Sequence, residues 1–334
     1  MLAGMKNIAR RALNRTRTPD PRPAAKGWCS RDEVIMGTAV RVELWSDERA
    51  AGADAMAAVM AEMDRIDRLM SPYKPESELS RINSDAAAQA VPVSAELFDL
   101  IARSIDFSVL SEGAFDITFA SAGHLYDYRR QVRPSDEELA RARAAIGYRN
   151  LILDASMHTV RFARAGVRID LGGFAKGHAV DRGAAILQSR GISHAIVSAG
   201  GDSHILGDRQ GRPWTIGIRD PRQAGDVIAV LPLQDVALST SGDYERYFEE
   251  GGVRFHHVLD PRTGKSPSGV RSVTVIAADG LTSEALTKTV FVLGVARGMA
   301  LVESQPGVDA VVIDGEGALH YSRGLRDGRL PTWQ

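Results

Sequence analysis

The chain of 334 residues contains one cysteine, Cys29. A single thiol forms no intramolecular disulfide and builds no multi-cysteine metal cluster. Aromatic residues make up only 6% of the chain, and 41 Lys and Arg oppose 42 Asp and Glu, for a formal net charge of -1. Because binding to nucleic acid by counterion release requires a strongly basic surface, this balance argues against nucleic acid as a partner.

Long apolar runs are also missing. No window approaches the ~20 consecutive apolar residues that cross a bilayer, so we expect no transmembrane segment. Residues 1–32 are rich in arginine and proline and are predicted to form a disordered basic leader. Arg10 and Arg11 suggest an export signal, but no apolar stretch of about 7–15 residues follows them. The sequence as written predicts a cytoplasmic protein, with a periplasmic location as the alternative if an upstream signal is missing.

Residues 33–334 are predicted to form one domain, because they contain neither an internal repeat nor a low-complexity linker. Methionines and aliphatic residues recur at helical spacing over residues 50–70, and Ser135 with Glu138 forms a capping box before another helix. Short apolar runs typical of strands dominate the second half. These patterns predict an α+β protein with mixed or antiparallel sheets and flanking helices.

The most informative segment is Asp170 to Asp181, which reads D-L-G-G-F-A-K-G-H-A-V-D. Residues 167–169 alternate at the strand period, and a helical pattern follows the two glycines. Gly172 and Gly173 therefore stand near a helix start, where free N–H groups favour an anion, and Lys176 adds a cation one turn later. By itself the segment is equally consistent with a glycine-rich helix entry beside a solvated lysine.

Two common phosphate-binding motifs are excluded in this segment. A Walker loop ends in Gly-Lys-Ser/Thr, whereas Lys176 precedes Gly177 and His178 follows. No G-x-G-x-x-G opens a helix after a strand, so the dinucleotide fingerprint is missing as well. A phosphate-binding role therefore needs support from the rest of the chain.

Further motifs supply that support as an ordered series. They are Met36-Gly37-Thr38, Ser71-Pro72-Tyr73 with Ser77 to Asn83, Gly113 to Thr118, Asp170 to Asp181, Val197 to Asp202, Ser239 to Tyr244 and His256 to Gly264. In this order they resemble the ApbE-type flavin transferases, which move FMN from FAD to a threonine or serine hydroxyl of another protein. The resemblance runs from about Glu33 to Gly294.

The resemblance implies a site, residue by residue. It assigns His257 as the catalytic group beside the reacting phosphate, and it implies FAD as the substrate and Mg²⁺ as a cofactor. The residues that it assigns to FAD binding are Met36, Tyr73, Ala114, Phe115, Asp116, Asp170 and Lys176. The backbone carbonyl of Gly173 would bind the metal. Each of these residues has an ordinary structural explanation when it is taken singly, as a core residue, a turn cap or a helix entry.

One departure concerns the metal site. The family places an aspartate and, four residues later, a threonine on one helix face in a D-A-L-x-T pattern, whereas this chain has Glu284 and Lys288 at those positions. A charged lysine cannot bind magnesium, so Thr287 becomes the candidate hydroxyl ligand beside Glu284. Alternatively, Glu284 and Lys288 form an i,i+4 ion pair.

The implied activity is therefore covalent flavinylation of an acceptor flavoprotein through a Thr or Ser, with release of AMP. Two alternatives remain open at this point: a non-catalytic FAD-binding protein, and a FAD pyrophosphatase that releases FMN and AMP. The chain contains no D-G-x-T-G-A-T-like target segment of its own. The acceptor is therefore expected to be a separate protein.

Overall fold

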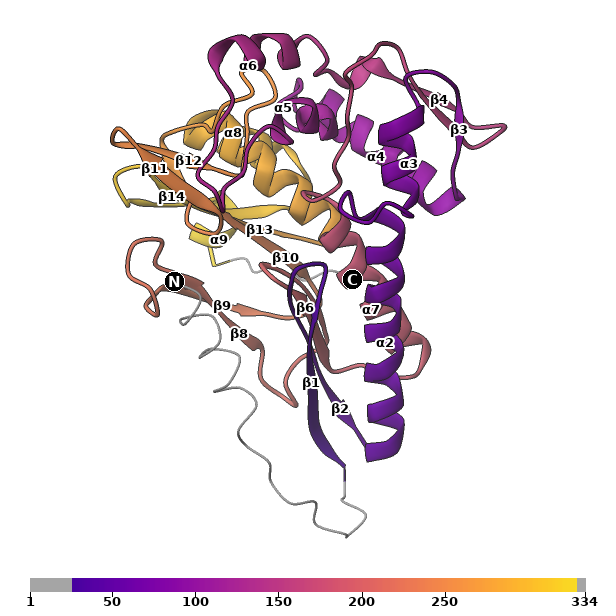
Figure 1. Ribbon diagram of the computed structural model, residues 1–334. Coiled ribbons are helices and arrows are strands. Elements are labelled where there is room, and N and C mark those ends of the chain that lie inside the picture. Colours follow the sequence, from indigo (N-terminus) through magenta and orange to yellow (C-terminus); the bar gives the residue numbers. More distant parts are fainter. Residues whose placement is uncertain (1–25, 329–334) are drawn as a thin grey trace.

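The computed structural model describes residues 26–328 (Figure 1). The helices are α2 (Arg49–Met70), α3 (Glu78–Asp85), α4 (Ala95–Leu110), α5 (Ala120–Gly123), α6 (Asp136–Arg143), α7 (Ala175–Ser189), α8 (Gly280–Ser304) and α9 (Arg323–Arg326). The strands are β1 (Gly27–Ile35), β2 (Thr38–Ser46), β3 (Val91–Pro92), β4 (Leu151–Asp154), β5 (Thr159–Phe162), β6 (Ala195–Ala199), β7 (Asp202–Leu206), β8 (Trp214–Arg219), β9 (Val227–Leu233), β10 (Ala237–Gly242), β11 (Tyr247–Glu250), β12 (Val253–His256), β13 (Val270–Ala277), β14 (Asp309–Asp314) and β15 (Leu319–Tyr321).

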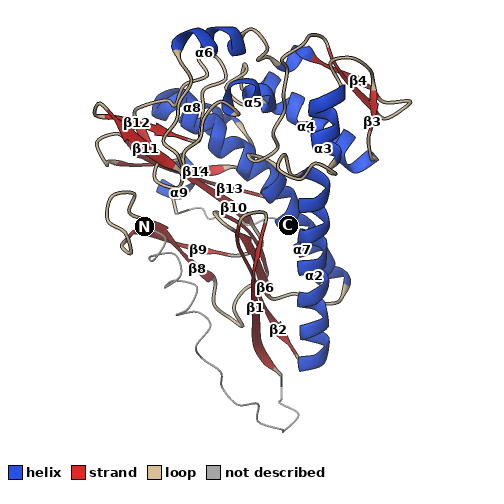
Figure 2. Cartoon of the chain, viewed as in Figure 1, coloured by secondary structure: helices blue, strands red, loops and turns tan. Residues whose placement is uncertain are grey.

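An eight-stranded sheet in the order β1-β2-β6-β7-β10-β13-β14-β15 forms the centre of the fold. Every neighbouring pair in it is antiparallel. Helices α2, α7 and α8 pack on one face, and α3 to α6 form a helical layer beyond α8 (Figure 2). The predicted α+β class with antiparallel sheets and flanking helices is confirmed.

Both faces of the central sheet are buried. Along β14, Ala310 and Val312 belong to the main core with the helices, whereas Val311 and Ile313 belong to a second core. That second core lies under the β8–β9 hairpin, which covers the opposite face. Alternation at the strand period thus places the apolar side chains of one strand in two cores.

Serine N-caps begin several helices, and the predicted capping box is one of them. Ser77, Ser94 and Ser135 each accept a backbone N–H as the N-cap of α3, α4 and α6, and Glu138 completes the capping box. The turn between β1 and β2 holds Met36 at φ 54° and Gly37 at φ 68°. Positive φ at both central residues matches the right-handed twist of a tight hairpin.

The start of the fold differs from the expected boundary. Residues 27–32, predicted to belong to the leader, form the first part of β1 and pair with β2 from Gly27 to Ile35. Trp28 provides a reason, because its ring packs edge-on against Trp45 and Trp214, at centroid distances of 5.7 and 5.2 Å. Residues 1–25 of the predicted leader lie outside the described residues.

The predicted strand over residues 167–169 is also not part of a sheet. The side chain of Asn83 takes the place of a neighbouring strand, because its amide accepts from Ile169 N at 2.8 Å and donates to Ile169 O at 2.9 Å. Ser121 Oγ likewise accepts from Arg168 N and donates to Arg168 O. The extended backbone that the sequence predicted is therefore present, but side chains rather than a neighbouring strand form its hydrogen bonds.

By length and composition, α8 alone among the described helices could cross a membrane, and half of its most apolar window is buried within the fold. In this structure it lies between the central sheet and α4 (Figure 1). Such a core helix meets the same two criteria as a membrane span.

Helices α7 and α8 approach so closely that only glycine fits at one crossing point. A Cβ at Gly177 would collide with the Gly280 carbonyl and lie 2.8 Å from Leu281 N, whereas a Cβ at Gly183 would meet the side-chain ends of Val197 and Val59, at 2.9 and 3.0 Å. We expect Gly177→Ala to lower the free energy of unfolding by about 3 kcal/mol or more, because backbone atoms must separate.

The comparison variant Gly183→Ala should cost less, about 1–2 kcal/mol, since it meets two buried valine methyls and no backbone atom, and alanine favours a helix. Urea denaturation of both variants measures the difference. Equal losses of stability would show that the backbone contact at Gly177 does not set how closely α7 and α8 approach.

Candidate active site

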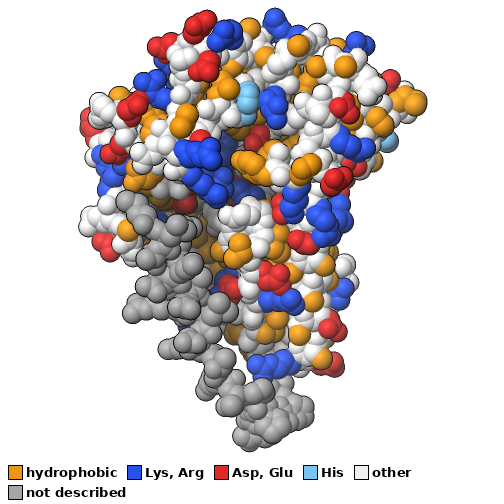
Figure 3. Space-filling view, viewed as in Figure 1, with side chains coloured by type: hydrophobic (Ala, Val, Ile, Leu, Met, Phe, Trp, Pro, Cys, Tyr) orange, Lys and Arg blue, Asp and Glu red, His pale blue; other side chains and the backbone are white. Residues whose placement is uncertain are grey.

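A cleft of about 540 Å³ opens between the helical layer and the central sheet. Its walls come from the loop after α2, residues 114–128, residues 168–173, the loops around β11 and β12, and α8. Figure 3 shows Lys and Arg side chains gathered around a hollow in the middle of this face. The cleft combines apolar surface with positive charge.

Aromatic side chains line part of the cleft. Tyr73 is 82% exposed, while Phe115 is buried and packs against Phe174. The rings of Tyr126 and Tyr128 are stacked, 5.7 Å apart with 4° between their planes. Exposed and stacked rings of this kind offer flat faces to a planar aromatic ligand.

Two carboxylates of the lining have structural partners. Asp116 accepts from Thr118 N at 2.8 Å, from Thr118 Oγ1 at 2.6 Å and from Tyr148 N at 2.6 Å. Asp170 accepts from Gly172 N at 2.6 Å. Burial raises the pKa of both carboxyls above the usual value. Both carboxylates stabilise the loops that form the wall.

A buried ion cluster lies behind the wall. The ammonium of Lys176 on α7 contacts Asp202 on β7 and Glu284 on α8, the latter at 2.6 Å. The other oxygen of Glu284 accepts from Gly177 N at 2.7 Å, and Asp202 also accepts from Ser239 Oγ. Burial acts to lower the pKa of Lys176, but the two carboxylates outweigh it and raise that pKa. Burial, together with the charge of Asp202, raises the pKa of Glu284.

Lys288 connects this cluster to the cleft. It lines the cleft, donates to Ser241 Oγ at 2.7 Å, and holds its ammonium 3.8 Å from Glu284. Its stem passes over Gly173, where a Cβ would lie 3.3 Å from Lys288 Cγ. Burial lowers the pKa of this lysine, and the charge of Glu284 opposes that effect.

His257 lines the cleft, whereas its neighbour His256 does not. Its backbone N–H donates to Arg246 O at 3.1 Å, and its buried Nδ1 has no partner among the described residues. Burial, with help from the charge of Lys288, lowers the pKa of His257 to about 3. His256 instead contacts Pro267 O through Nε2 and packs against Phe291.

The D-P-R-T-G segment forms the turn that fixes the chain after His257. Asp260 accepts from the backbone N–H of Arg262 at 2.9 Å and from its Nε at 2.8 Å. The backbone N–H of Gly264, at φ 69°, donates to Asp260 O at 2.7 Å. Tyr126 Oη closes the turn against the cleft wall by donating to Gly264 O at 2.9 Å.

The structure brings most of the predicted site residues together. Those that line the cleft are Tyr73, Ala114, Phe115, Asp116, Asp170, Gly173 and His257. Lys176, Glu284 and Thr287 lie behind it in or beside the ion cluster, and Met36 packs against the main core outside the lining. The predicted roles of all these residues remain proposals.

Sequence reasoning missed several lining residues, among them Arg168 and Arg246, whose guanidinium groups have no ion-pair or hydrogen-bond partner among the described residues. Arg168 lies in the predicted strand just before Asp170, and nothing in the sequence marks it as a site residue. Tyr126 and Tyr128 share the strand period, a signal that could have placed both on one wall.

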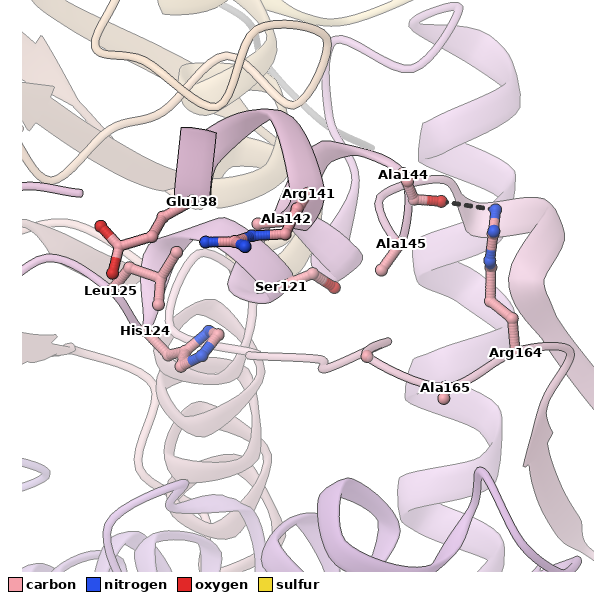
Figure 4. Close-up of a pocket in the computed structure, with 11 residues that line it drawn as sticks. Ser121, His124, Leu125, Glu138, Arg141, Ala142, Ala144, Ala145, Arg164 and Ala165 are labelled. Atoms are coloured by element: carbon pink, nitrogen blue, oxygen red, sulfur yellow. Dashed lines mark hydrogen bonds between the residues drawn. The ribbon is translucent and has the colours of Figure 1, made fainter. Parts of the chain in front are cut away.

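A second pocket of about 400 Å³ adjoins the cleft and shares His124 with it (Figure 4). Arg164 donates to Ala144 O at 2.7 Å along its edge, and Glu138 lies at the other end. None of the predicted site residues lines it. The larger cleft is therefore the candidate active site.

A cleft that combines flat aromatic faces with unpaired cations defines a class of protein that binds a planar ring joined to an anionic group. Comparison with known proteins identifies the family within this class. The sequence model of the ApbE family matches residues 36–312. The FAD:protein FMN transferase of Treponema pallidum is 33% identical over an alignment of 317 positions, which covers 89% of this chain and 88% of that protein.

Solved structures agree. The ApbE protein of Thermotoga maritima is 36% identical, with a TM-score of 0.84 over 90% of this chain and 98% of that one. The flavin transferase ApbE of Vibrio cholerae is 29% identical, with a TM-score of 0.81 over 90% and 99% of the two chains. The chain belongs to the ApbE family.

The buried ion cluster supports a test of stability. We expect Lys176→Met to lower the free energy of unfolding by about 3–5 kcal/mol, because it leaves Asp202 and Glu284 buried with one counter-charge fewer. Arg141→Met is the control, since its ion pair with Glu137 is exposed and its loss should leave stability nearly unchanged. Urea denaturation compares the two, and an equally small loss in both would contradict a structural role for the cluster.

Proposed function

We propose that this protein is an enzyme that transfers FMN from FAD to a threonine or serine hydroxyl of an acceptor protein and releases AMP. The relatives that carry the name FAD:protein FMN transferase support this activity. The single structural observation that carries it is the cleft in which His257 lies with Lys288 and the aromatic residues Tyr73 and Phe115. The aromatic side chains of the cleft suit a flavin ring, and the part beside Lys288 suits phosphates.

The reaction is a displacement at the phosphorus on the FMN side of the pyrophosphate. The acceptor oxygen forms a new bond to that phosphorus, the bond to the bridging oxygen breaks, and AMP leaves with the bridging oxygen. Such a transfer needs positioning and neutralisation of the phosphate charge more than covalent participation by the protein. Arg168, Arg246 and Lys288 are the cations that line the cleft for this purpose.

His257 is proposed to accept the proton of the acceptor hydroxyl. Because burial lowers its pKa to about 3, the imidazole is neutral in the free protein at neutral pH and is free to take a proton. Approach of the negative phosphates favours the protonated form, so the imidazole becomes a stronger base once FAD is bound. The buried, unpartnered Nδ1 is consistent with a ring held for a ligand.

The family resemblance also implies magnesium, held by Gly173, Glu284 and Thr287. Both carboxylate oxygens of Glu284 accept hydrogen bonds, from Lys176 Nζ and Gly177 N, and Thr287 Oγ1 donates to Glu284 O at 2.7 Å. Among the described residues, no group of three or more His, Cys, Asp or Glu side chains is arranged for a metal. These residues do not fit the ion as they stand.

The proposed function is tested by incubating the pure protein with FAD, with and without an acceptor that carries a D-G-x-T-G-A-T-like segment. We expect AMP to appear only with the acceptor, and the acceptor to become covalently fluorescent. AMP and free FMN without acceptor would indicate a pyrophosphatase instead. Bound, intact FAD in both reactions would indicate a binding protein.

The role of His257 predicts a separation of binding from transfer. We expect His257→Ala to reduce the transfer rate by ~10²–10⁴-fold, the usual effect of losing a general base, while FAD binding is largely kept. FAD affinity is measured by fluorescence quenching and transfer by acceptor labelling. His320→Ala, which changes a histidine outside the cleft, is the control. Full activity in His257→Ala would remove this residue from the mechanism.

The lowered pKa of His257 predicts a pH profile. Its imidazole should stay neutral as pH falls through the ordinary value of 6.5 and become protonated only near about 3. Since kcat/KM reports the free enzyme, kcat/KM for FAD should stay level through 6.5 and fall only in stronger acid. An acid limb centred near 6.5 that disappears in His257→Ala would contradict this, with folding checked at each pH by circular dichroism.

A further inference from the structure

We propose that the ammonium of Lys288 is a built-in cation that takes the place of a metal ion at the FAD pyrophosphate, so that this enzyme holds its substrate without a divalent ion. This inference rests on the proposed function and adds the source of the charge at its site. It starts from the position of Lys288, which lines the cleft, passes over Gly173 and donates to Ser241 Oγ.

The charges of the cluster balance without a metal. Two ammonium groups, of Lys176 and Lys288, face two carboxylates, of Asp202 and Glu284. A divalent ion added to this neutral cluster would leave two uncompensated positive charges in a buried place, which is costly. With a threonine at position 288 the same cluster would carry one excess negative charge and would attract a cation.

The hydrogen bonds point to the same conclusion. Lys288 Nζ lies 3.4 Å from Thr287 Oγ1 and 3.8 Å from Glu284 Oε1, beside both candidate metal-binding side chains. Thr287 Oγ1 also accepts from Ser241 Oγ at 3.0 Å. The lysine therefore meets the same polar atoms that a metal ion would need.

The rest of the cleft supplies further positive charge for the phosphates. Arg168 and Arg246 line it, and no other described residue pairs with either guanidinium. Together with Lys288 they place three cations from three separate segments around one cleft. Protein side chains can therefore neutralise a pyrophosphate, as they do in other phosphoryl-transfer sites.

The test compares FAD affinity with magnesium and with a chelator, in the absence of acceptor. For the unaltered protein we expect the two affinities to agree within about twofold, and for Lys288→Thr we expect roughly tenfold or more weakening in chelator, restored by magnesium. Lys288→Arg keeps the charge and should behave like the unaltered protein. Lys26→Thr makes the same change at an exposed position just before β1 and serves as the control.

Thermal unfolding without FAD gives a second readout. Magnesium should leave the melting temperature of the unaltered protein unchanged and raise that of Lys288→Thr, because only the variant gains a cation site in the folded state. This measurement also shows whether the variant is folded.

Three results would each overturn the proposal. The unaltered protein could lose FAD binding in chelator, or its melting temperature could rise with magnesium. The third is a folded Lys288→Thr whose FAD affinity and melting temperature do not change with magnesium. Failure of FMN transfer to an acceptor, with metal-independent FAD binding intact, would count against the transferase activity and leave the role of Lys288 supported. The two proposals therefore fail in different measurements.

Discussion

The ion cluster of Lys176, Asp202 and Glu284 is the interaction on which the site depends. It joins α7, β7 and α8, three elements that are distant in the sequence, directly behind the wall of the cleft. Charges buried in this way are tolerated only when each has a partner, so the cluster requires the two helices and the strand to meet in one arrangement. The position of Lys288 over Gly173 follows from that arrangement, because Glu284 and Lys288 are one turn apart on α8.

Close backbone contact makes the cluster possible. Gly177 lets α7 approach Gly280 at the start of α8, and its N–H donates to Glu284. Beside it, Asn83 and Ser121 hold the extended segment that leads into α7. Polar side chains thus substitute for a neighbouring strand, which leaves the segment in the cleft wall with Asp170 and Gly173 facing the ligand space.

The chemistry of the site is mainly electrostatic. His257 is kept neutral by burial, while Arg168, Arg246 and Lys288 carry positive charge into the same cleft. A site of this kind lowers the barrier to phosphoryl transfer by being organised before the substrate arrives, since its dipoles and charges need not reorient during the reaction. Glu284 and Lys288, which stand in place of a metal-binding pattern, agree with such preorganisation. In the proposed role, the ammonium of Lys288 supplies a positive charge that a metal ion from solution would otherwise supply.

The sequence by itself determined the local structure and the family. Serine caps, the capping box at Ser135 and Glu138, the helix over residues 49–70 and the alternating strands follow from short-range patterns, and the ordered motifs placed most of the cleft-lining residues. Only the tertiary structure decided which partners these residues have. It showed that Lys176 faces two carboxylates, that Met36 lies outside the lining, that residues 27–32 join the sheet, and that Arg168 and Arg246 enter the cleft. The physical reason is that burial and charge pairing arise between segments about a hundred residues apart, such as Lys176 and Glu284, and no local pattern encodes them.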